Sequence, residues 1–181
     1  MKTSVARRLT PPTSRLRRFV LFLLLAAVTP WSHALAQEKK PRDLTHFNLG
    51  KASLAIAGFD PVAYFPDGGG KPKKGLETIT TTHEGVLYRF ANEDNRKKFL
   101  ASPAQYEPQY GGWCAFAMAD KDKVEIDPES FVITDGKLFL FFKAWYADTR
   151  AKWSRNEKEL MTKADKVWKE MNQPKPKPKD G

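Results

Sequence analysis

The chain has 181 residues, of which 41% are apolar, 12% aromatic and 29% charged, a composition that excludes a disordered or fibrous protein and is typical of one folded domain. The formal net charge is +10, but residues 1–36 hold six bases and no acid. The rest carries 25 bases and 21 acids, a net of +4, which argues against a nucleic-acid-binding protein.

Residues 1–36 have the order of an export signal. A basic stretch precedes an apolar run over 19–28, and a small-residue A-x-A motif ends at Ala36. The run is shorter than the roughly 20 residues of a spanning helix, so we predict cleavage between Ala36 and Gln37 rather than a retained membrane anchor. The mature protein is then periplasmic or secreted, with no stable membrane insertion. The two arginines before the run partly match a twin-arginine signal, so the general secretory and twin-arginine routes both stay open.

The mature chain divides by composition. Residues 37–48 are polar and charged and are expected to be a leader outside the domain. Residues 172–181 alternate proline and lysine, which favours a solvated, disordered tail. Between them, 49–171 is long enough to build one hydrophobic core.

The first half of this domain predicts a hairpin followed by a helix. Asp60 before a proline is typical of the start of a short helical turn. Two β-rich runs, 78–82 and 86–90, flank a short loop containing Gly85. Asn92, followed by two acids, is a suitable cap for a helix.

The second half predicts another hairpin and C-terminal helices. Asp135-Gly136 is a strong signal for a type I′ turn. The strand that follows, 137–142, is apolar on both faces, so both faces should be covered. Apolar residues recur at helical spacing up to Met171, and Ser154 with Glu157 suggests a fresh helix start. The predicted fold class is α+β: a small single domain of antiparallel hairpins packed with short helices and a helical C-terminal region.

Three motifs in the middle of the chain resemble one known family. They are Gly58-Phe59-Asp60-Pro61-Val62-Ala63-Tyr64-Phe65, Pro108-Gln109-Tyr110-Gly111-Gly112-Trp113-Cys114-Ala115, and Asp127-Pro128 with Asp135-Gly136-Lys137-Leu138-Phe139-Leu140. Together they resemble the exported bacterial branch of the YHS domain family, over about residues 56–168. The resemblance implies a presumed metal-binding module and carries no enzymatic activity with it.

The chain departs from this family at the positions that bind metal. Metal-associated members resemble Asp-Pro-Val-Cys near the start, where Ala63 stands here. The strand-to-helix junction at 90–95 holds no sulfur, although the family carries a cysteine pair there. The family's usual thiolate ligands are therefore absent, while His83 resembles the family's histidine before its turn glycine.

Cys114 is the one cysteine and the one reactive candidate. Met118, four residues on, would share its face, and a thiolate with a thioether suits copper as Cu(I), with His46 or His83 adding a nitrogen. The alternative is a buried cysteine that packs as a small hydrophobe. Tyr110 and Trp113 are candidate walls of a ligand pocket. A Cys114–His83 nucleophile lacks an orienting group, so we expect no enzyme.

These observations leave two functions. The first is an exported, non-enzymatic YHS-like module that binds a metal ion or small ligand near Cys114. The second is a structural or partner-binding envelope protein without a ligand of its own.

Overall fold

The computed structural model describes residues 42–173. The predicted signal peptide, its cleavage site at Ala36 and Gln37, residues 37–41 of the leader and residues 174–181 of the tail lie outside the described residues. The described part is α+β, as predicted, with five α-helices and three two-stranded antiparallel sheets. None of the described helices is long and apolar enough to cross a bilayer.

The first half is built on the predicted hairpin. Its elements are the 3₁₀ turns η1 (Lys51–Ser53), η2 (Ile56–Gly58) and η3 (Pro66–Gly68), strands β1 (Leu76–His83) and β2 (Val86–Phe90), and helices α1 (Glu93–Ala101) and α2 (Pro103–Tyr106). Strands β1 and β2 pair antiparallel, as expected. The Asn92 side chain caps α1 by accepting a hydrogen bond from the Asn95 amide at 2.8 Å, which confirms the predicted cap.

The second half contains the other hairpin and the C-terminal helices. Its elements are η4 (Gln109–Gly112), α3 (Ala115–Met118), β3 (Asp127–Thr134), β4 (Lys137–Phe141), β5 (Lys143–Ala144), β6 (Ala147–Asp148), α4 (Thr149–Trp153) and α5 (Glu157–Met171). Asp135 and Gly136 have φ of 51° and 71°, so the turn between β3 and β4 has positive φ at both positions, as predicted.

The helical region divides where the sequence suggested, but not by the predicted cap. Helix α5 begins after Asn156, which makes no side-chain capping bond. The Ser154 hydroxyl instead donates to the Arg150 carbonyl within the preceding helix. Glu157 is engaged elsewhere, because its carboxylate accepts from the Trp153 indole at 3.0 Å.

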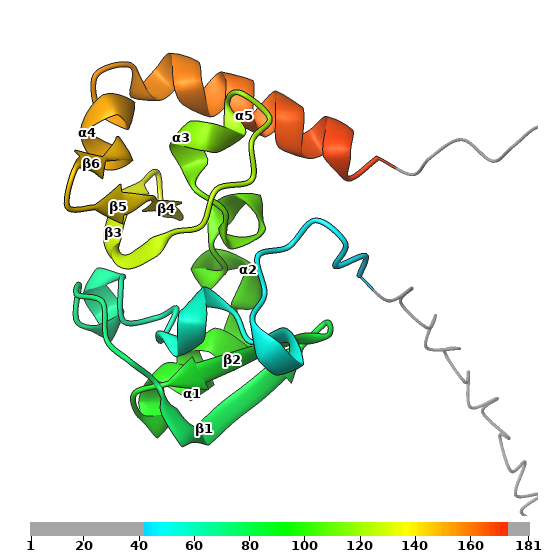
Figure 1. Cartoon of the computed structure of the whole chain (residues 1–181). Helices are drawn as coiled ribbons and strands as arrows, with labels where there is room; N and C mark the ends of the chain where they lie inside the picture. The colour runs from blue at the N-terminus through cyan, green and yellow to red at the C-terminus, as the bar shows by residue number, and fades with distance from the viewer. Residues whose placement is uncertain (1–41, 174–181) are drawn as a thin grey trace, which may run out of the picture. The chain divides into compact units, whose positions relative to one another are not determined.

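Strand β4 separates two hydrophobic cores. Leu138 and Leu140 face the first core, which gathers around the β1–β2 hairpin and α1. Phe139 and Phe141 face the second core, which is covered by α3, α4 and α5. Figure 1 shows these two groups of elements on opposite sides of β4. Successive residues of a strand point to opposite faces, so the two-faced apolar pattern of this strand is explained by its burial on both sides.

Candidate functional site

The segment before the predicted domain boundary packs on the domain. We call residues 42–49 the strap. The sequence assigned 37–48 to a leader, yet Leu44 and Phe47 pack against the first core, and the Phe47 ring meets the Trp168 ring edge-on at 5.7 Å. Residues 37–48 were assigned to a leader because they are polar on average. The two apolar side chains within them were the signal that part of this segment packs on the domain.

Hydrogen bonds fix the strap to the turn η4. The Asn48 amide donates to the Gly111 carbonyl at 2.8 Å, and the Asn48 side chain donates to the Gly112 carbonyl at 3.2 Å. The indole of Trp113 donates to the His46 carbonyl at 2.8 Å. The strap is therefore a built part of the fold rather than a loose end.

A pocket of about 230 Å³ lies beside the strap. Its walls are partly apolar and partly polar, and they come from the strap, the region of η2, β2, α2, η4 and α5. They include Phe47, Leu49, Ala55, Ile56, Val86, Tyr110 and Trp168, with Arg42, Asn48, Tyr88, Glu107 and Gln109 as the polar members. Such a combination of apolar walls and a few converging polar groups is the usual form of a small-molecule site.

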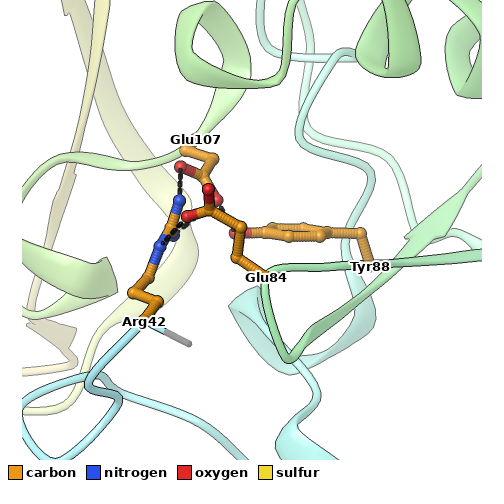
Figure 2. Close-up of polar contacts among 4 residues, drawn as sticks. All are labelled: Arg42, Glu84, Tyr88 and Glu107. Carbon is orange, nitrogen blue, oxygen red and sulfur yellow. Dashed lines mark hydrogen bonds and ion pairs between the residues drawn. The ribbon is translucent and has the colours of Figure 1, made fainter. Parts of the chain in front are cut away.

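Figure 2 shows a charged cluster of four residues. Three of them, Arg42, Tyr88 and Glu107, line this pocket. The Arg42 guanidinium donates to both oxygens of Glu107, at 2.8 and 3.0 Å, in a fork geometry. Its Nε donates to Glu84 at 2.6 Å. The Tyr88 hydroxyl donates to Oε1 of Glu107 at 2.8 Å. The strap, the β1–β2 turn, β2 and the loop after α2 thus meet at one set of polar atoms.

The surroundings keep Arg42 and Tyr88 in fixed protonation states. Burial lowers the pKa of Arg42, but the hydrogen bonds and negative charges of Glu107 and Glu84 outweigh it, so the pKa lies above its usual value. Burial and the charge of Glu107 raise the pKa of Tyr88 well above that of a free tyrosine. The Arg42 guanidinium therefore stays charged and the Tyr88 phenol stays protonated near neutral pH.

Unusual backbone conformations also line the pocket. Ile56 has φ of 50°, which is rare for a β-branched residue, and Tyr110 has φ of 54°. Gly111 follows with φ of 59°, and a Cβ there would lie 2.7 Å from the Trp168 ring. The glycine lets the η4 backbone approach α5, which brings the Tyr110 ring to the pocket wall.

The two aromatic residues predicted to line a pocket have different surroundings. Tyr110 lines the pocket, and its hydroxyl donates to Asp165 at 2.9 Å. Burial, followed by this hydrogen bond, raises the pKa of Tyr110. Trp113 is not among the residues that line the pocket; it holds the strap, and the Lys123 ammonium lies 5.8 Å from its ring centroid.

Cys114 and Met118 lie in the second core. Cys114 precedes α3, and its side chain is fully buried, as is that of Met118. The thiol lies 3.3 Å from the Thr149 hydroxyl, which itself donates to the Phe142 carbonyl at 3.0 Å. This environment matches the alternative of a cysteine that packs as a small hydrophobe.

The residues expected to bind metal do not form one site. The His83 ring meets Phe99 edge-on at 5.9 Å, and Phe99 belongs to the first core, whereas Cys114 and Met118 belong to the second. Within residues 42–173, no group of three or more His, Cys, Asp or Glu side chains is placed to hold a metal ion. The structure therefore does not bring His83 to the buried thiol and thioether, and copper binding by Cys114 and Met118 stays a prediction from sequence.

The sequence did not indicate the charged residues of this cluster as site residues. Arg42 and Glu107 are 65 positions apart, and Arg42 and Glu84 are 42 apart. A single arginine in a polar segment and single glutamates in loops carry no spacing that would connect them. Only the folding of the strap onto the domain brings them together.

Comparisons with family models, curated proteins and solved structures give no match to this chain. The functional proposal therefore rests on the pocket and the two cores described above.

Proposed function

We propose that this chain is an exported, non-enzymatic YHS-like module that binds a small organic ligand in the pocket beside the strap. The observation that carries the proposal is the charged cluster of Arg42, Glu107 and Tyr88 in the wall of a partly apolar pocket. Export is supported by the signal-like order of residues 1–36 and family membership by the three motifs, both of which remain predictions from sequence.

The pocket favours a particular kind of ligand. Aromatic and aliphatic walls from Phe47, Ile56 and Trp168 suit a flat or branched apolar body. The polar side offers Arg42, which uses three of its five N–H groups within the cluster, and the acceptor Glu107, so it suits a neutral polar head that both gives and accepts hydrogen bonds. A volume of about 230 Å³ limits the ligand to a small molecule.

Two features support ligand binding over the other functions considered. Cys114 and His83, the nucleophile and base considered for an enzyme, are apart, because Cys114 lies in the second core and His83 packs on Phe99 of the first core. The sulfur pair of Cys114 and Met118 is enclosed by apolar side chains, so we place the ligand at the pocket, which shares the wall residue Tyr110 with the second core.

The test uses a plug and a matched control. Ala104 on α2 is exposed and lines the pocket, so Ala104→Trp should fill the pocket without disturbing the core. Ala101, the last residue of α1, is exposed and is not among the residues that line the pocket, so Ala101→Trp adds the same side chain elsewhere. Protein recovered from the periplasm should be examined by native mass spectrometry and by metal analysis.

We expect an extra non-covalent organic mass on the wild-type chain and on Ala101→Trp, and its loss from Ala104→Trp. The same spectra should show a polypeptide beginning at Gln37. If Ala104→Trp kept the extra mass, the ligand would not bind in this pocket. Stoichiometric metal in place of that mass would contradict an organic ligand. A wild-type chain without any bound mass would favour the partner-binding envelope protein instead.

A further inference from the structure

The short hairpin β5–β6 presents two aromatic side chains to solvent. Trp145 is 96% exposed and Tyr146 66% exposed, and they occupy the two turn positions between the strands. The other large hydrophobic residues exposed within 42–173, Leu76 and Leu100, are each about half exposed and lie on β1 and α1. A tryptophan with almost its whole surface in water is a conspicuous departure from the rest of the described surface.

Turn chemistry does not account for these residues. Two-residue hairpin turns ordinarily take Gly, Asn or Asp, because those residues adopt the required backbone at little cost. The hairpin base is nevertheless well held, since the Phe142 carbonyl accepts from both the amide and the hydroxyl of Thr149, at 3.1 and 3.0 Å. Trp145 and Tyr146 also support each other, with ring centroids 5.3 Å apart. The hairpin therefore holds the two rings outward on a fixed base.

The same stretch of chain is rich in bases. Residues 142–155 contain four bases and one acid, a net of +3; the bases are Lys143, Arg150, Lys152 and Arg155, all exposed. The acid, Asp148, is engaged by the Ser130 hydroxyl at 3.1 Å and by Arg150 at 3.4 Å. Strand β6 leads directly into α4 (Figure 1). Lys143 lies on β5, Arg150 and Lys152 lie on α4, and Arg155 lies between α4 and α5.

An aromatic tip with adjoining bases fits a lipid surface better than a protein partner. Tryptophan and tyrosine favour the headgroup level of a bilayer, and bases are attracted to anionic lipids by about 1 kcal/mol each. A stable protein partner ordinarily needs about 800 Å² on each side, far more than two side chains supply. The small apolar area and the positive charge together specify the occupant.

We infer that the β5–β6 tip docks reversibly on anionic phospholipid bilayers, with Trp145 and Tyr146 at the headgroup level and Lys143 and Lys152 near the lipid phosphates. The docking is peripheral and leaves the fold unchanged. It is independent of the pocket, because none of these residues lines that pocket.

The experiment is vesicle flotation of the chain as recovered from cells. Vesicles of phosphatidylglycerol and phosphatidylcholine in equal parts should bind it, whereas phosphatidylcholine alone should bind it weakly. Trp145→Ala should lower the partition coefficient by about tenfold, the effect of losing one large apolar side chain from the interface. Lys143→Gln and Lys152→Gln should each lower it by about fivefold and reduce its dependence on salt.

Matched controls lie on α1. Leu100→Ala and Lys97→Gln remove an exposed apolar group and an exposed base there and should leave binding unchanged. Quenching of tryptophan fluorescence by brominated lipid chains should fall in Trp145→Phe, a readout that a general loss of stability would not reproduce.

Three results would overturn the inference. One is equal binding by the wild type and Trp145→Ala. Another is equal binding to the neutral and the anionic vesicles. The third is no vesicle binding together with a concentration-dependent dimer that Trp145→Ala dissociates, which would make the hairpin a protein contact.

Discussion

The two faces of β4 border cores of different character. The first core borders a fully buried carboxylate, Asp60, and a buried amide, Asn95, and the pocket with the charged cluster lies at its edge. The second core is made of aromatic, aliphatic and sulfur-containing side chains, including Cys114 and Trp153. The difference teaches that the most reactive residue type of this chain lies in its most apolar region, whereas the polar machinery is built from ordinary Asp, Glu, Arg and Tyr side chains.

The largest effect should come from removing the carboxylate of the first core. Asp60 accepts hydrogen bonds from the amides of Val62 and Ala63, at 2.9 and 3.3 Å, and from the Ala91 amide and Asn95 side chain, at 2.8 and 2.7 Å. Asp60→Ala would leave these donors without their acceptor. We expect the free energy of unfolding in urea to fall by about 3–5 kcal/mol.

Asp94→Ala is the control, because Asp94 lies exposed on α1 and pairs only loosely with Lys97 at 3.6 Å. That variant should change stability by less than about 0.5 kcal/mol. Equal effects of the two substitutions would remove the distinction between a polar and an apolar core.

In the second core, we expect a polar substitution to lower the free energy of unfolding. Cys114→Ser should lower the free energy of unfolding by about 1–3 kcal/mol, because a hydroxyl costs more to bury than a thiol. Cys114→Ala controls for lost volume. The native thiol should resist a disulfide reagent until the chain unfolds; rapid labelling of the folded protein would show that this core is open to solvent.

Alkaline pH should lower the stability of the domain through Tyr88, which lines the pocket beside the first core. Tyr88 has a raised pKa in the folded state, owing to burial and to Glu107, so it stays protonated where an unfolded tyrosine ionises. The stabilisation that Tyr88 gives to the free energy of unfolding is complete below about pH 10. It is lost as pH rises further, by up to about 1.4 kcal/mol per pH unit.

Tyr88→Phe should therefore flatten the fall of stability above pH 10, as followed by denaturation at a series of pH values. Tyr146→Phe, at the exposed hairpin tip, is the control and should leave the slope as in the wild type. A slope unchanged in both variants would count against the buried hydrogen bond between Tyr88 and Glu107.

The smallest effect should come from the turn that sets the register of β4 between the two cores. Gly136 has φ of 71°, and a Cβ there would meet nothing within 4 Å, so Gly136→Ala is disfavoured by backbone conformation alone. We expect a loss of about 1 kcal/mol by thermal denaturation. Gly50→Ala, at φ of −76°, should be nearly neutral; a neutral Gly136→Ala would mean that the turn relaxes.

Local chemistry made much of the fold predictable. The Asp135-Gly136 turn, the cap at Asn92 and the two-faced pattern of β4 depend on neighbouring residues, and all three appear as expected. The predicted capping box at the start of α5 is absent, because Ser154 and Glu157 form hydrogen bonds with Arg150 and Trp153 instead. Short-range signals state which bonds are possible, and the tertiary structure decides which ones form.

The candidate site was predictable only in part. Tyr110 was expected in a pocket wall and lies in one. Arg42, Glu84 and Glu107 come from three distant segments, and their meeting depends on Phe47 and Leu44 drawing the strap onto the first core. Long-range convergence of this kind leaves no periodicity or spacing in a single sequence.

Strand β4 also determines how cooperatively the described domain unfolds. Each core uses two side chains of this strand, so neither can lose its packing without stripping apolar contacts from the other. Unfolding is then cooperative across both cores, and subglobal opening is confined to elements outside them, such as the β5–β6 tip. We therefore expect the amides of Leu138 to Phe141 to exchange their hydrogens only through complete unfolding, so that their protection should measure the stability of the domain as a whole.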